Sequence, residues 1–222
     1  MNRLSVTDSL RQSAAAIWEK CLSHPFVAGI GDGSLDIEKF RYFMLQDYLY
    51  LFDYARVFAL GVVKAREPEL MRTFARNVDA ILGGEMNIHR AYMQRLGISE
   101  AQVFAVQPAL DNLSYTHYML SVAHAGTPMD IVAAILACSW SYAEIGQSLA
   151  AIPGALTHPF YGEWIQGYAG EEYAATNRAL IDLMNRLAAD ATPAQLNRLK
   201  EIFVNCSRYE LGFWDMAWEM RP

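Results

Sequence analysis

The sequence predicts an all-α protein built as a single helical bundle. Two observations support this fold class: apolar residues recur at three- and four-residue steps, and helix start and stop signals recur along the chain. Leu45, Tyr48, Leu49 and Phe52 show the apolar spacing of a buried helix stripe. Alternating β patterns, repeats and linker-like stretches are not found. One domain covering residues 1–222 is therefore the simplest account.

The start signals have the composition of helix N-caps. They are Ser99 with Gln102, Thr127 with Pro128 and Asp130, and Thr192 with Pro193 and Gln195. Stop signals fall at Gly31–Gly33, Gly97, Gly126, Pro153–Gly154 and Gly170. Together they predict helices over residues 5–22, 36–65, 68–96, 99–104, 108–125, 128–151, 159–168, 171–190 and 193–219.

Composition narrows the class of partner. The 222 residues are 53% hydrophobic and 19% charged, which is typical of a globular chain with a buried core. The formal net charge is −6 and there is no Lys/Arg run, so we expect neither nucleic acid nor an anionic membrane as a partner. A cationic or neutral small molecule is compatible with this charge.

The cysteines and the N-terminus indicate a reducing compartment. Cys21, Cys138 and Cys206 are widely spaced and form no CxxC pair, which argues against a disulfide framework or a cysteine-rich zinc site. The N-terminus is polar and has no signal-peptide core, and no uncharged apolar stretch reaches about 18 residues. We therefore expect a cytoplasmic protein without a membrane span.

The segment 40–54 is the first that could carry chemistry. Asp47, Tyr50 and Tyr54 are spaced three and four residues apart, so they share one helix face. The surrounding residues are almost all apolar or aromatic, and a carboxylate there must be paired, hydrogen-bonded or neutralised. Asp47 is then either a structural carboxylate satisfied by tyrosines or a ligand-binding group.

The segment 135–146 contains Cys138 one turn before Tyr142. Most buried cysteines are only small apolar residues. A reactive cysteine needs a lowered pKa, a nearby proton acceptor and access to a pocket. The local sequence leaves both interpretations open.

The segment 203–215 contains Glu210, one turn after Cys206 and one turn before Trp214. Its apolar neighbours predict that it points inward. Burial would raise the pKa of such a carboxyl group and let it move protons near neutral pH. The alternative is a salt bridge to an arginine such as Arg208 or Arg56.

Tyr115 and Tyr168 lie outside these segments and add two flat surfaces with polar tips, which suit a planar heterocycle. A metal site is a weaker interpretation. Its candidate ligands are Glu85 with His89 one turn later, and the distant Glu144, whereas a helical di-iron site typically uses two Glu-x-x-His pairs and further carboxylates. We therefore expect no metal.

Taken together, the ordered segments resemble the TenA family, also called thiaminase II or aminopyrimidine aminohydrolase, of haem-oxygenase-like fold. The likeness runs from about residue 8 to about residue 220. The matching residues are Gln46-Asp47-Tyr48-x-Tyr50-Leu51, Tyr115, Cys138 with Tyr142 and Glu144-Ile-Gly146, Trp164-Ile165 with Tyr168, and Ser207-x-Tyr209-Glu210 with Phe213-Trp214. The family often has a proline before the cysteine, where this chain has Ala137.

The resemblance implies a role for each candidate residue. Cys138 would be the nucleophile and Glu210 its acid/base partner. Asp47 would bind the amino-pyrimidine edge. The remaining pocket residues would be Tyr50, Tyr115, Tyr142 and Tyr168. The implied reaction converts 4-amino-5-aminomethyl-2-methylpyrimidine, or thiamin more slowly, to the 5-hydroxymethyl compound, without metal or cofactor.

The resemblance also implies a homotetramer. Two alternatives stay open at this point: a di-iron or cofactorless oxidase on the same fold, and a non-catalytic pyrimidine- or thiamin-binding regulator.

Overall fold

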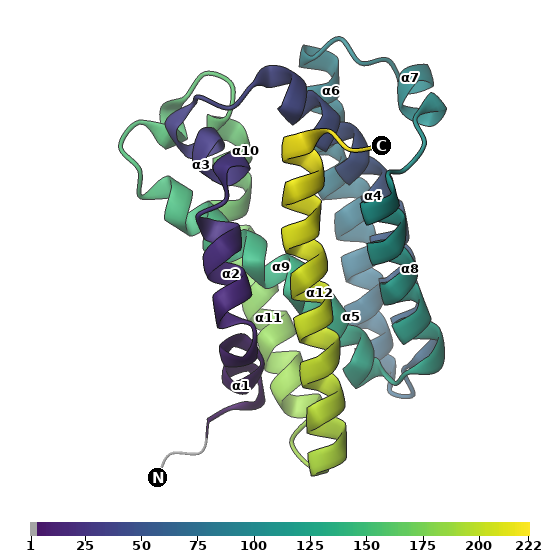
Figure 1. The fold of residues 1–222 in the computed structure, drawn as a ribbon. Coiled ribbons are helices and arrows are strands. Elements are labelled where there is room, and N and C mark those ends of the chain that lie inside the picture. Colours follow the sequence, from purple (N-terminus) through teal and green to yellow (C-terminus); the bar gives the residue numbers. More distant parts are fainter. Residues whose placement is uncertain (1–3) are drawn as a thin grey trace. The chain divides into compact units, whose positions relative to one another are not determined.

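In the computed structural model, which describes residues 4–222, every regular element of that range is a helix (Figure 1). The prediction of an all-α chain is therefore confirmed. The first six elements are α1 (Val6–Ser13), α2 (Ala15–Leu22), α3 (Pro25–Asp32), α4 (Ile37–Lys64), α5 (Pro68–Asp79) and the π-helix η1 (Ala80–Glu85). The others are α6 (Met86–Arg95), α7 (Glu100–Ala105), α8 (Leu110–Ala125), α9 (Pro128–Ala150), the 3₁₀ helix η2 (Ala155–Thr157), α10 (Gly162–Ala169), α11 (Glu171–Leu187) and α12 (Pro193–Glu219).

The helices form two compact units. The first unit contains the chain up to Leu35 and residues Val132–Trp214, and the second contains Asp36–Ile131 and Asp215–Pro222. Helices α9 and α12 each have residues in both units. The single domain expected from the sequence stays a prediction.

Helix α4 organises the second unit, where α5 and α8 pack along it (Figure 1). It begins at Asp36, whose carboxylate accepts a hydrogen bond from the N–H of Glu38 at 2.9 Å. Near its other end, a β-carbon on Gly61 would collide with the ring of Phe74 on α5. The absence of a side chain at Gly61 therefore allows the two helices to approach each other closely.

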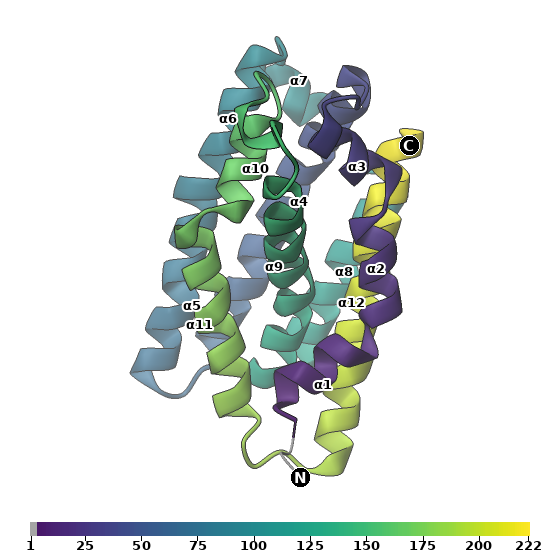
Figure 2. The ribbon, with the colours of Figure 1, turned by 90° about the vertical axis from the view of Figure 1, so that its left-hand side faces the viewer.

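Helix α9 is the core helix of the first unit. Residues Val132–Ala137 are fully buried. The helix is long and apolar enough to cross a membrane, but 78% of its most apolar window is buried inside the protein, as in the core of a globular fold. Gly146 brings α9 against the end of α10, because a β-carbon there would lie 2.6 Å from the carbonyl carbon of Tyr168. Helix α10 then leads into α11 at Gly170 (Figure 2).

The three predicted N-caps are confirmed. Ser99 and Gln102 form a reciprocal capping box at the start of α7. Thr127 and Asp130 exchange bonds in the same way at α9, as do Thr192 and Gln195 at α12. The predicted stops at Gly33, Gly97, Gly126 and Gly170 also directly follow helices or their last turns.

Three sequence predictions about helices were wrong. The helix expected over residues 5–22 is two helices, because Ala14 leaves the helical conformation at φ −106° and ψ 6°. Helix α3 was missed: the ring of His24 accepts a bond from the N–H of Phe26, Pro25 occupies the first helical position, and Gly33 ends the helix at φ 78°. The helix expected over residues 68–96 is α5 and α6 separated by the π-helix η1.

Candidate active site

Cys138 lies on α9, immediately after the fully buried stretch. Its residue surface is 9% exposed, against 1% for Cys21 and 0% for Cys206. None of these three cysteines is in a disulfide. A nucleophilic thiol must be reachable by its electrophile, so Cys138 meets this condition better than the other two.

An aromatic cluster lies next to the position of Cys138 in the first unit. Tyr142, one turn further along α9, packs against Tyr168 of α10 with ring centroids 4.9 Å apart. Trp164 lies 4.6 Å from Tyr168, and Trp214 of α12 lies 5.3 Å from Tyr142. The structure thus brings the predicted pair Tyr142 and Tyr168 together. Trp164 and Trp214 belong to the same cluster, although no binding role was predicted for them.

Glu210 is buried on α12, as its apolar neighbours predict. Burial, and next the negative charge of Glu210, raise the pKa of the Cys206 thiol well above its usual range. Cys206 therefore stays protonated and is a poor nucleophile. The arginines considered as partners of Glu210 bind elsewhere: Arg208 donates to Asn205, and Arg56 pairs with Asp53.

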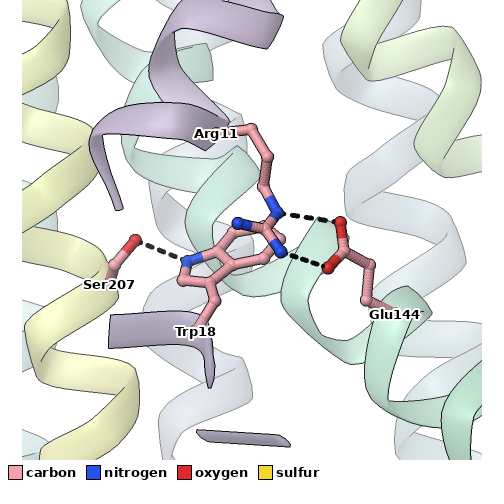
Figure 3. A network of polar contacts seen from close by, with 4 residues as sticks. All are labelled: Arg11, Trp18, Glu144 and Ser207. Atoms are coloured by element: carbon pink, nitrogen blue, oxygen red, sulfur yellow. Dashed lines mark hydrogen bonds and ion pairs between the residues drawn. The ribbon is translucent and has the colours of Figure 1, made fainter. Parts of the chain in front are cut away.

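A polar network ties together the helices that carry Cys138 and Glu210 (Figure 3). Arg11 of α1 forms a two-pronged ion pair with Glu144 of α9, at 2.9 Å from Nε and 2.7 Å from Nη2. Its guanidinium group lies 4.3 Å from the ring centroid of Trp18 on α2. The indole N–H of Trp18 in turn donates to the hydroxyl of Ser207 on α12 at 2.9 Å.

This network has consequences for the position of the reactive groups. Glu144 lies six residues after Cys138, and Ser207 lies one turn before Glu210. Helices α1 and α2 therefore hold α9 and α12 in a set register within the first unit. The network also engages Glu144 in an ion pair, so the carboxylate that was considered as a metal ligand has a structural partner.

Asp47 lies on α4 in the second unit and is bonded to a histidine. Its Oδ2 atom is 2.6 Å from Nε2 of His89 on α6, and both side chains are buried. The other ring nitrogen of His89, Nδ1, is 3.0 Å from the backbone carbonyl oxygen of Glu85. The sequence suggested tyrosines as hydrogen-bond partners of Asp47, whereas its partner in the structure is His89.

The electrostatics of this pair favour a charged histidine. Burial alone would lower the pKa of His89, but its hydrogen bond to Asp47 and the negative charges of Asp47 and Glu85 outweigh burial. The net effect raises the pKa of His89 above its usual value. Because His89 is engaged by Asp47, it is not available in this arrangement as the metal ligand that the sequence suggested. No group of three potential metal-binding side chains gathers in the described part of the chain.

Tyr50 and Tyr115 form a second aromatic cluster in the same unit. Their ring centroids are 5.3 Å apart, and Tyr54 stacks on Tyr50 at 5.4 Å. The hydroxyl of Tyr50 lies 3.7 Å from the sulfur of Met119. The shared helix face of Asp47, Tyr50 and Tyr54 is thus buried, as the spacing predicts. The pairing of Tyr50 with Tyr115 of α8 could not be read from spacing alone.

The helical architecture is that of the haem-oxygenase-like fold. A solved domain from Shewanella denitrificans, described as having a heme oxygenase-like fold, is similar in backbone with a TM-score of 0.78 at 15% identity. That likeness covers 96% of this chain and 92% of the other, and it confirms the predicted fold class.

The chain belongs to the TENA/THI-4/PQQC family, whose model matches residues 11–220. It is 49% identical to an aminopyrimidine aminohydrolase of Halalkalibacterium halodurans, over 98% of this chain and 97% of the relative. It is 45% identical to an aminopyrimidine aminohydrolase of Helicobacter pylori, over 97% of this chain and the whole relative. A solved TenA homologue from P. horikoshii OT3 has a TM-score of 0.89 at 30% identity, covering 97% of this chain and 99% of the other.

Proposed function

We propose that this chain is an aminopyrimidine aminohydrolase of thiamin salvage. Its substrate would be 4-amino-5-aminomethyl-2-methylpyrimidine, with thiamin as a slower substrate. The observation that carries the proposal is Cys138, which is the most exposed of the three thiols and lies one turn from the cluster of Tyr142 and Tyr168. The near full-length similarity to two aminopyrimidine aminohydrolases supports the same assignment.

The proposed reaction begins with addition of the Cys138 thiolate to C6 of the pyrimidine ring. Glu210 protonates the ring nitrogen on which negative charge develops. The electrons of the new adduct then break the bond from the exocyclic carbon to the protonated amino group, which departs as ammonia. Water adds to the exocyclic carbon that this step exposes, and the released ammonia takes up the proton that the water loses. The thiolate finally leaves the ring, and the ring-nitrogen proton returns to Glu210.

The other candidate residues bind rather than react. Asp47 would accept a hydrogen bond from the ring amino group, and Tyr50, Tyr115, Tyr142 and Tyr168 would stack on or border the ring. The residues in these roles are buried or nearly so, which favours strong polar recognition. The reaction needs no metal or cofactor. The working form would be a cytoplasmic homotetramer.

An ammonia-release assay tests the proposed function. The aminomethylpyrimidine is incubated with the wild type, with Cys138→Ser and with Cys21→Ser, a buried thiol of α2 that serves as the matched control. We expect turnover in the wild type and in the control, and a loss of at least about 10³-fold in Cys138→Ser. Unchanged turnover in Cys138→Ser would refute the mechanism.

The same preparation separates the two alternatives. An oxidase would contain stoichiometric iron or consume oxygen, and it would release no ammonia from the aminomethylpyrimidine. A non-catalytic regulator would bind the pyrimidine, and even the wild type would release no ammonia.

A further inference from the structure

The hydrogen bonds of the buried Asp47–His89 pair show where its protons must lie. A carbonyl oxygen can only accept a hydrogen bond, so Nδ1 of His89, at 3.0 Å from the Glu85 carbonyl oxygen, must carry a hydrogen. A second proton must lie between Nε2 and the Asp47 carboxyl oxygen at 2.6 Å, because two lone pairs cannot face each other at that distance. The pair is then either imidazolium with carboxylate or neutral imidazole with carboxylic acid.

The surroundings select the first of these forms. The groups that act on His89 are Asp47 from α4 and Glu85 from the end of η1, both acidic, and they raise the pKa of His89 against the effect of burial. The other close neighbour from α4 is Tyr48, whose ring centroid lies 6.4 Å from the imidazole. Within the second unit these groups therefore favour the form with a charged histidine.

The chain departs from regular helix immediately before this pair. The π-helix η1 contains Gly83 and Gly84, and a β-carbon would meet no described atom within 4 Å at either position. One extra residue in a helix rotates every later side chain by about 100°. The π-helix therefore decides which side chains of α6 face α4, and it directs His89 onto Asp47. Such insertions are frequent at functional sites.

We propose that His89 is a positioning residue, which keeps Asp47 ionised and oriented so that its carboxylate accepts a hydrogen bond from the ring amino group of the substrate. This inference rests on the function proposed above. An amino group on a pyrimidine is a donor. An ionised carboxylate only accepts hydrogen bonds, whereas a protonated carboxyl group also carries an O–H donor. A carboxylate has about four acceptor sites, and His89 occupies one of them.

The first test measures how strongly the protein prefers a ligand with a ring amino group. The probes are 4-amino-5-hydroxymethyl-2-methylpyrimidine and the same compound with hydrogen in place of the 4-amino group. Calorimetry compares them with the wild type, with His89→Gln, and with His117→Gln, an exposed histidine of α8, as the control. Gln places an N–H near the position of Nε2 but carries no charge.

We expect the wild type and the control to prefer the amino ligand by tenfold or more at pH 6 to 9. In His89→Gln the carboxylate loses the charged hydrogen-bond donor that orients it. The preference for the amino ligand should therefore fall about tenfold. KM for the amino substrate should rise in this variant, while kcat changes less. A purely structural role would weaken both ligands equally at every pH, and that result would overturn the proposal.

The second test uses the wild type alone, so it does not depend on the folding of a variant. Nitrogen-15 NMR of histidine-labelled protein reports the protonation of each ring nitrogen of His89. We expect both nitrogens to be protonated at pH 7.5. An unprotonated ring nitrogen on His89 would overturn the inference even if the enzyme is active. If the wild type binds neither pyrimidine, the proposed function fails and the recognition role of His89 fails with it.

Discussion

The contacts that position the candidate residues differ between the two units. In the second unit, Asp47 is held by a 2.6 Å bond to His89, which is itself bonded to a backbone carbonyl. In the first unit, contacts of Arg11 and Trp18 hold α9 and α12, the helices that carry Cys138 and Glu210. A group that recognises a ligand gains from a fixed orientation, whereas a nucleophile must move as it forms and breaks a bond.

This difference predicts how kinetic effects divide between the units. Substitutions of the reactive groups in the first unit should mainly lower kcat. Substitutions of the held groups in the second unit should mainly raise KM, because they remove binding that is present before and during the reaction.

The largest effect short of the nucleophile itself is expected at Glu210. Glu210→Gln keeps the shape of the side chain but cannot transfer a proton, so kcat should fall by about 10² to 10³-fold with little change in KM. Steady-state ammonia release measures both constants. A change in KM alone would show that Glu210 binds the substrate rather than reacts. It would also contradict the prediction that substitutions in the first unit mainly lower kcat.

Asp47→Asn should give the next largest effect. The amide replaces an oxygen acceptor with a donor, and it also removes the charge that faces His89. We expect KM to rise by about 10 to 100-fold and kcat to change less than tenfold. Equal losses in kcat and kcat/KM would show that Asp47 acts in the transition state only.

Arg11→Met should reduce stability more than chemistry. The ion pair with Glu144 is two-pronged and its side chains are about one quarter exposed, so its loss should cost about 1 kcal/mol of unfolding free energy. Urea denaturation measures this change. Arg178→Met, which removes a more exposed pair with Glu171, is the control and should have a smaller effect. An equal loss in both variants would show that the network of Figure 3 has no special role in the first unit.

The smallest effect is the dependence of stability on pH through His89. Its pKa is raised in the folded protein, so the folded state binds this proton more tightly than the unfolded state. The stabilisation is fully present below the unfolded pKa of about 6.5 and is lost as pH rises through the folded value. Urea midpoints of the wild type and of His89→Gln are measured at pH 6, 7.5 and 9. The difference between the two midpoints should become smaller as pH increases. A constant difference would contradict the charged form of His89.

The sequence predicted most helices because capping residues and apolar spacing act over a few residues. Ser99, Thr127 and Thr192 begin their helices where their side chains can bond the first turn. The π-helix η1 could not be predicted, since its local composition also suits an α-helix. Helix α3 was missed because its glycines resemble a loop and its cap is a histidine ring.

Of the candidate site, spacing within a helix predicted that Asp47 shares a buried face with Tyr50 and that Tyr142 follows Cys138 by one turn. It could not predict contacts between helices. His89 lies 42 residues from Asp47, and its direction depends on the register set by η1. The glutamate one turn before His89 suggested a metal ligand pair, whereas the backbone carbonyl of Glu85 is what His89 contacts.

The division between the units is tested most directly by Cys138→Ala. One preparation is measured for ammonia release from the aminomethylpyrimidine and, by calorimetry, for affinity toward the hydroxymethyl product. We predict that turnover falls by at least about 10³-fold while affinity stays within about threefold of the wild type. Retained turnover would contradict the role of Cys138 as nucleophile, and a parallel loss of affinity would contradict the separation of reaction from recognition.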